Sequence, residues 1–231
     1  MKKVYFGIAL VLALSLCLFA GCKKAPTEEK SPLEKRVSTY HDAVYVGSND
    51  DFNASFVTGE CEKLIVIDGE VGDLAPFATL TVTPLSAPLF NNAYSYVLKG
   101  ETGELTGDLT KDVVGAAFSA EVKDAKTIGK ILSVTVKAEG ILESDVPLTD
   151  KLDGALTWKE ILSIAGKELS ETIAAESDTG NLQREIYVKL VNALSAGDAP
   201  YYYYVSFIKS PSDYWALLLD PTTGEVISKK I

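Results

Sequence analysis

The sequence predicts an α+β protein, in which an N-terminal all-β, sandwich-like domain precedes a domain of one helix and four antiparallel strands. Three observations support this. Apolar and polar residues alternate between frequent turn formers from residue 39 to about 142, as in short half-buried strands. A helix-start motif at Thr157 opens a stripe of apolar residues at helical spacing. Four further strand-like runs follow. A chain of 231 residues suits one large domain or two small ones.

Residues 1–21 have the pattern of an export signal. Two lysines precede an uncharged apolar stretch that ends in small residues, the arrangement of a cleavable signal peptide. The motif Leu18-Phe19-Ala20-Gly21-Cys22 resembles the lipobox of bacterial lipoproteins. This resemblance implies that Cys22 receives a diacylglycerol thioether, becomes the first residue after cleavage and is then N-acylated. The alternative, an uncleaved membrane anchor, is disfavoured by the small residues before the cysteine and the polar run after it.

These features predict a protein anchored by lipid in the cell membrane or outer membrane and facing the extracytoplasmic side. Residues 22–38 comprise the lipidated cysteine and a polar tether with two prolines. Once Cys22 is lipidated, Cys61 is the one thiol outside the signal segment. We therefore expect no intramolecular disulfide, and the hydrophobic core must supply the stability.

The β-domain is predicted to span residues 39–142. Its turn formers include Asp68-Gly69 and Asn91-Asn92. No cysteine pair identifies an immunoglobulin domain. The expected strands cover residues 44–46, 52–57, 64–67, 78–82, 94–98, 116–122 and 132–137.

Residues 143–156 are expected to form a linker, and the helix follows over 157–175. Thr157 and Glu160 have the spacing of a capping box, in which each side chain satisfies a free amide at the helix start. The apolar stripe of the helix consists of Trp158, Ile161, Leu162, Ala165, Leu169 and Ile173.

Four strands are expected after the helix, over residues 185–193, 201–209, 214–220 and 225–229. The last hairpin turns at Asp220-Pro221-Thr222-Thr223-Gly224. An apolar strand, this turn and the following Glu-Val together resemble the end of a PepSY-like domain, and the resemblance covers 157–231. It implies one helix on an antiparallel sheet, a role in binding or restraining a partner, and no catalytic residues.

The composition excludes several functional classes. The formal net charge is −10 and the chain holds two arginines, Arg36 and Arg184, so it offers no basic surface for nucleic acid. His41 is its one histidine, which excludes sites built from several imidazoles. We expect no metal and no cofactor.

Three short motifs have ordinary structural explanations. Asp178-Thr179-Gly180 matches the aspartic-protease triplet, but it follows a helix and has no second copy. Ser206 and Lys209 match a Ser-x-x-Lys pair, yet residues three apart on a strand point to opposite faces. The acidic turn at Asn49–Asn53 lacks the spacing of a calcium loop.

The tyrosines at 201–204 supply the candidate binding face. Pairing across the turn at 210–213 is expected to set Ile208 opposite Trp215, so that both faces of the terminal sheet are apolar. One helix covers one face. The other meets the β-domain, a second copy or a partner, with Tyr201, Tyr203 and Tyr214 as anchors.

We therefore expect a lipid-anchored lipoprotein that is not an enzyme and acts as a protein-binding or regulatory module. Its partners are the membrane, through the diacylglycerol on Cys22, and a protein. The alternatives are a hydrolase of unrecognised type and a carrier that holds a small ligand in the β-domain.

Overall fold

The computed structural model of the protein describes residues 30–64, 67–113, 115–176, 182–192 and 200–231. The predicted export signal, Cys22 and residues 23–29 of the tether lie outside these ranges, as does the triplet at 178–180. Residues Pro32–Ile231 form one compact unit. No helix in the described ranges has the length and apolar character needed to span a bilayer.

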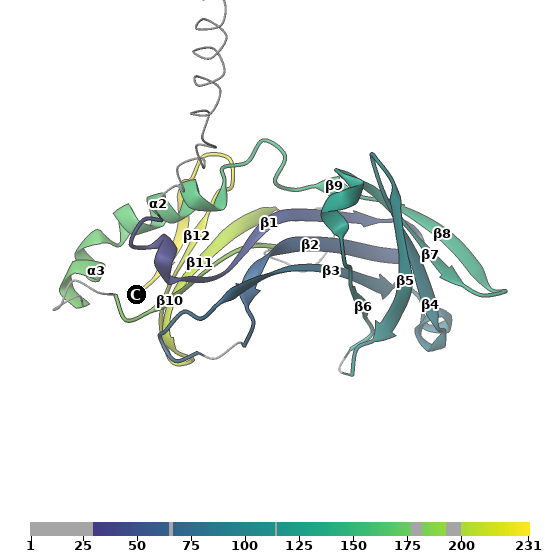
Figure 1. Ribbon diagram of the computed structural model, residues 1–231, viewed down its shortest axis with the longest axis horizontal. Helices are drawn as coiled ribbons and strands as arrows, with labels where there is room; N and C mark the ends of the chain where they lie inside the picture. The colour runs from purple at the N-terminus through teal and green to yellow at the C-terminus, as the bar shows by residue number, and fades with distance from the viewer. Residues whose placement is uncertain (1–29, 65–66, 114, 177–181, 193–199) are drawn as a thin grey trace, which may run out of the picture. The chain divides into compact units, whose positions relative to one another are not determined.

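The prediction of an α+β fold is wrong, because the described chain is β-rich with two short α-helices (Figure 1). Thirteen strands form one sheet, in the order β13-β12-β11-β10-β1-β2-β3-β6-β5-β4-β7-β8, with β9 also paired to β1. The strands are β1 Val37–Ser48, β2 Phe52–Glu62, β3 Leu74–Pro84, β4 Tyr94–Gly100, β5 Glu104–Lys111, β6 Phe118–Glu121, β7 Ile131–Ala138, β8 Leu142–Pro147, β9 Thr149–Asp150, β10 Glu185–Asn192, β11 Tyr201–Ser210, β12 Asp213–Leu219 and β13 Val226–Lys230.

Strand β1 joins the two parts of the sheet. Its first residues pair in parallel with β10, from Val37 opposite Ile186 to Tyr40 opposite Val188. Further along the same strand, Tyr45 pairs with Asp150 of β9. Along one edge of β1, the parallel partner β10 is thus followed by the antiparallel partner β9, while β2 pairs with the other edge.

Strands β1 to β9 close on themselves. Leu148 alone separates β8, which pairs with β7, from β9, which pairs with β1. The interior of this ring holds one hydrophobic cluster, with Phe52, Leu80, Leu98, Val134, Val136 and Val146 fully buried. Gly47 permits the closure, because a Cβ there would lie 1.8 Å from the carbonyl oxygen of Pro147.

A second hydrophobic cluster lies between the helices and strands β10–β12. Helix α2 (Trp158–Glu168) begins at Thr157 with the predicted capping box, and α3 (Ser170–Glu176) follows it. Ile161, Leu162, Ala165 and Leu169 are buried against the strands, as the apolar stripe predicted. Both helices lie on the same side of β10–β12 in Figure 1.

The expectation of a separate PepSY-like domain is wrong for a specific reason. The helix and the four terminal strands form close to their predicted bounds. However, β1 pairs with β10, and its residues Val37 and Val44 belong to the cluster under the helix. The terminal strands therefore extend the large sheet. The segment 143–156, expected as a linker, contains most of β8 and all of β9.

Candidate functional site

The tyrosine run lies in β11, and its pairing differs by one residue from the predicted register. Trp215 faces Phe207 and Tyr214 faces Ile208. The prediction failed because a bulge at Lys209 separates the pair Ser210–Asp213 from the pair Ile208–Tyr214. A shift of one residue moves each side chain of a strand to the other face.

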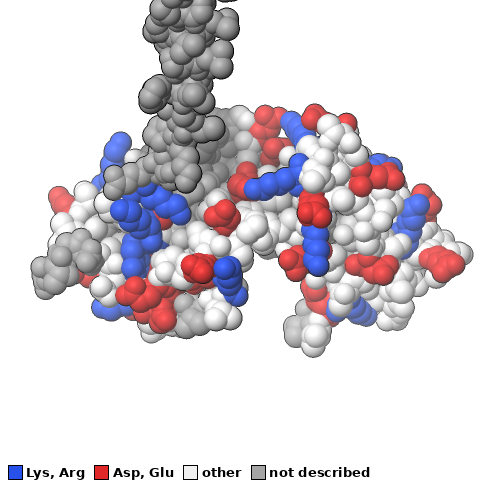
Figure 2. All heavy atoms as spheres, in the orientation of Figure 1, with Lys and Arg blue, Asp and Glu red and all other residues white. Residues whose placement is uncertain are grey.

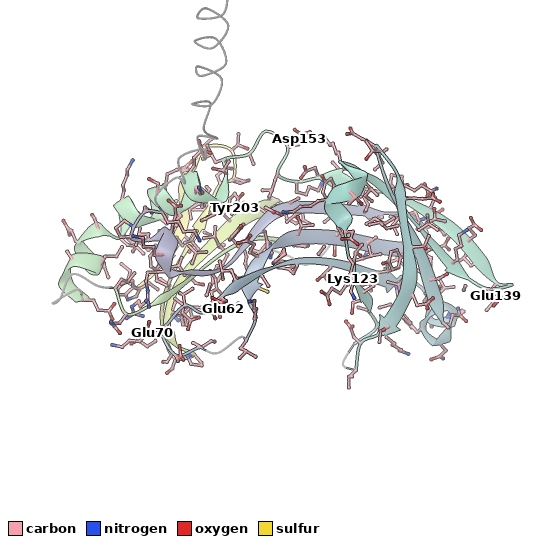
Figure 3. The ribbon with its side chains drawn as sticks, in the orientation of Figure 1. Glu62, Glu70, Lys123, Glu139, Asp153 and Tyr203 are labelled. Carbon is pink, nitrogen blue, oxygen red and sulfur yellow. The ribbon has the colours of Figure 1, made fainter. Side chains whose placement is uncertain are left out.

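The three predicted anchors therefore do not share a face. Tyr203 is 1% exposed within the helix cluster, and its hydroxyl donates to the Leu156 carbonyl oxygen at 3.0 Å. Burial and the nearby Asp150 raise the pKa of Tyr203 to about 12. Tyr201 packs at the margin of the same cluster, while Tyr214 points to the opposite side. Figure 3 shows Tyr203 on the side of the strands where α2 lies.

The side of β10–β12 opposite the helices carries a second set of aromatic residues, which we call the tyrosine face. Its large side chains are partly exposed, and none belongs to either hydrophobic cluster. At its centre, Ser206 lies opposite Ala216, and the larger side chains surround this small pair. The tyrosine face consists of Tyr187, Lys189, Val191, Tyr202, Tyr204, Ile208, Tyr214 and Leu218, with Lys230 of the neighbouring strand β13 at its edge.

Lysines lie against the aromatic rings of the tyrosine face. Lys189 Nζ is 4.7 Å from the ring centre of Tyr187. Lys230 Nζ, from the edge strand β13, is 3.4 Å from that of Tyr214. These are cation–π distances. Burial lowers the pKa of Lys189 and raises the pKa of Tyr204, so these groups are partly shielded from water.

One carboxylate, Glu185, occupies a position of β10 on this side, and it is fully buried. Its Oε1 accepts from the backbone amides of Asp68 and Gly69, each at 3.0 Å. The loop that holds Glu185 therefore limits the tyrosine face at one end. The described side chains of β10–β12 that remain accessible on this side are aromatic, apolar and cationic.

The charge pattern elsewhere is mixed. Lys and Arg alternate with Asp and Glu on the side of the molecule that Figure 2 shows, and neither sign covers a broad area there.

The single histidine has a structural position. His41 Nδ1 accepts a hydrogen bond of 3.2 Å from the backbone amide of Leu190, and its ring meets Phe77 edge-on. Burial, helped by the charge of Lys189, lowers the pKa of His41 to about 4, although the carboxylate of Asp42 acts in the opposite direction. Sequence analysis gave no sign of this contact between β1 and β10.

Two of the three motifs that were set aside lie in the described ranges. Lys209 pairs with Glu176 of α3 at 3.6 Å, on the helix side of β11, whereas Ser206 lies on the opposite side. Asn49 caps the β1–β2 turn, since its Oδ1 accepts from the amides of Asp51 and Phe52, each at 2.9 Å. Within the described ranges, no three acidic, histidine or cysteine side chains gather as metal ligands do. Cys61 is a free, partly buried thiol on β2.

Sequence analysis missed most of the tyrosine face. Tyr202, Tyr204 and Lys189 could have been found from the alternation Tyr187-x-Lys189 and from the other half of the tyrosine run, had the bulge been foreseen. No family model, curated protein or solved structure shows significant similarity to this chain.

Proposed function

We propose that this chain is a lipid-anchored extracytoplasmic lipoprotein that acts without catalysis, as a module that binds a partner protein through the tyrosine face. The observation that carries the proposal is the side of β10–β12 opposite the helices. It presents four tyrosines, three aliphatic side chains and two lysines that are at least partly exposed, and they belong to neither core.

Tyrosines suit such a role because each combines a large apolar ring with a polar hydroxyl. Ile208 and Leu218 add apolar area between them. Lys189 and Lys230 are the charged groups, and the one carboxylate on this side is buried under a loop. Charge complementarity therefore favours a partner segment that carries Asp or Glu beside apolar residues.

The proposed anchor would hold this module near a bilayer. The motif ending at Cys22 supports lipidation, and residues 23–38 give the tether a polar, proline-containing composition. A module with a net negative charge would be repelled by anionic lipid headgroups. We therefore favour a protein over the membrane surface as the occupant of the tyrosine face.

Site-specific photo-crosslinking in native membranes tests the proposal. A photoreactive phenylalanine analogue replaces Tyr204 in the full chain, and it also replaces Leu132 as the matched control. Leu132 is 50% exposed on β7, away from the tyrosine face. We expect a protein adduct at position 204 that is absent at position 132, with the crosslink mapped to an acidic segment of the partner.

Two double variants complete the test. Tyr202→Ser with Tyr214→Ser should abolish the adduct at position 204 and leave the melting temperature within a few degrees of the parent. Replacing Lys189 and Lys230 by Gln should weaken capture and make it insensitive to salt. An adduct to a second copy of this chain, an adduct to lipid, or equal labelling at 132 and 204 would each overturn the proposal.

A further inference from the structure

A polar groove lies outside the strand ring, on the side of β1–β3 that faces away from the first core. Its cavity volume is about 440 Å³, within the range of small-molecule sites. One wall of the groove is formed by the end of β10 and the start of β11, where Tyr201 lines the groove. Strand β9 contributes Thr149 to the lining. This groove does not include any residue of the tyrosine face.

The floor of the groove is a lattice of hydrogen-bonding side chains. Asn53 lies opposite Thr83 and Ser55 lies opposite Thr81 on the paired strands β2 and β3. Side chains directly opposite each other are about 5 Å apart, and alternate residues along a strand about 7 Å apart. The described chain provides no side-chain hydrogen bond to any of these four groups.

The walls add an aromatic ring and a cation. Lys151 Nζ lies 5.8 Å from the ring centre of Tyr201. Lys151 makes no ion pair with a described residue, although acids outnumber bases in the chain by 32 to 22. Among the described residues that line the groove, none is Asp or Glu. Among the described residues, the lining is therefore hydroxyl-rich, and Lys151 is the one charged side chain in it.

A solvated outer face of a sheet also carries Ser, Thr and Asn, so polarity alone would mean little. Three features separate this groove from such a face. The polar groups line a concavity, they converge with an aromatic ring from a distant part of the chain, and they lie beside Lys151, for which the described residues offer no ion-pair partner. We propose that the groove binds a saccharide that carries a carboxylate group.

The chemistry of each wall matches one part of such a ligand. Hydroxyl and amide side chains both donate and accept, as sugar hydroxyls do. The C–H face of a pyranose ring packs against the apolar face of Tyr201. Lys151 pairs with the carboxylate, and the absence of acidic lining residues in the described part avoids repulsion. This site extends beyond the proposed protein-binding function and does not depend on it.

Calorimetry on the full chain in detergent tests the inference. The probes are cellobiuronic acid, its neutral counterpart cellobiose, and sodium acetate, each titrated to about 10 mM, since small sugars bind weakly. We expect cellobiuronic acid to bind, cellobiose to bind about tenfold more weakly and acetate to give no saturable signal, because a charge-assisted bond contributes about one decade.

Variants locate the site. Thr81→Val with Thr83→Val keeps the shape of both side chains and should weaken cellobiuronic acid about tenfold. Lys151→Gln should remove the preference for the acid over cellobiose. Thr106→Val, at an exposed position on β5, is the matched control and should change nothing. Failure of both sugars to bind, acetate binding as well as the acid, or an unchanged affinity in the double variant would overturn the inference.

Discussion

His41 makes the stability of this protein depend on pH in a predictable window. The pKa of its imidazole falls from an ordinary value near 6.5 to about 4, because the ring is buried beside Lys189. The unfolded chain therefore binds the proton more readily than the folded chain. The contribution of His41 to the free energy of unfolding is therefore fully present above about pH 6.5, the pKa of the imidazole in the unfolded chain. It is lost as the pH falls from about 6.5 toward 4, the pKa in the folded chain.

The two pKa values determine the size of the loss. Between about pH 7 and pH 5, protonation of the unfolded state at one such histidine lowers the free energy of unfolding by about 2 kcal/mol. The carboxyl groups with shifted pKa values, Asp145, Glu160 and Asp220, are all shifted downward. They therefore change protonation mainly below this window.

Urea unfolding at both pH values measures the effect, and His41→Asn supplies the control. The Asn amide oxygen takes the place of Nδ1 and can accept from the amide of Leu190. It does not titrate, so its stability should stay nearly constant between the two pH values. Equal losses in parent and variant would refute the reasoning, as would an imidazole pKa at or above 6.5 by NMR in the folded chain.

Four further predictions address other parts of the structure. Tyr203→Ser should destabilise the fold by about 3–5 kcal/mol in urea unfolding, because it empties a fully buried site and leaves the Leu156 carbonyl oxygen unpaired. Tyr204→Ser, on the partly exposed tyrosine face, should cost about 1 kcal/mol or less in the same assay. Thr157→Ala should cost about 1 kcal/mol in thermal unfolding, since it removes the side-chain acceptor of the capping box. Cys22→Ser should abolish incorporation of labelled fatty acid and processing before residue 22; continued labelling would disprove the proposed lipidation.

Elements with a local signal were predictable from the sequence. The start of α2 follows from Thr157 and Glu160, whose reciprocal bonds need only four consecutive residues. The hairpin between β12 and β13 follows from Asp220, which accepts from the amides of Thr222 and Thr223. Gly224 has a φ of 74°, as a turn of this kind requires.

Elements that depend on distant pairing were not predictable. β5 reads as a polar loop with Gly107 at its centre, and it becomes a strand because the ring of Tyr96 fills the space beside that glycine. β8 carries exposed acids that resemble a linker. Its Asp145 is held by the hydroxyl of Thr135 at 2.7 Å and by Lys99 at 3.2 Å. The parallel pairing of β1 with β10 joins segments about 150 residues apart and leaves no local pattern.

The candidate site depends on one bulge, and the helix core explains why that bulge is required. The tyrosine run offers rings to both faces, so tyrosines alone do not select a register. With the bulge at Lys209, α2 packs on Val205, Phe207 and Trp215. Without the bulge, one of the two strands would turn its opposite set of side chains toward the helix. Ser206 of β11 or Ala216 of β12 would then lie under α2 and leave a cavity. The packing of the core thus selects the tyrosines that face solvent, and the candidate face with Tyr204 and Tyr214 follows from the volume requirements of the opposite side of the sheet.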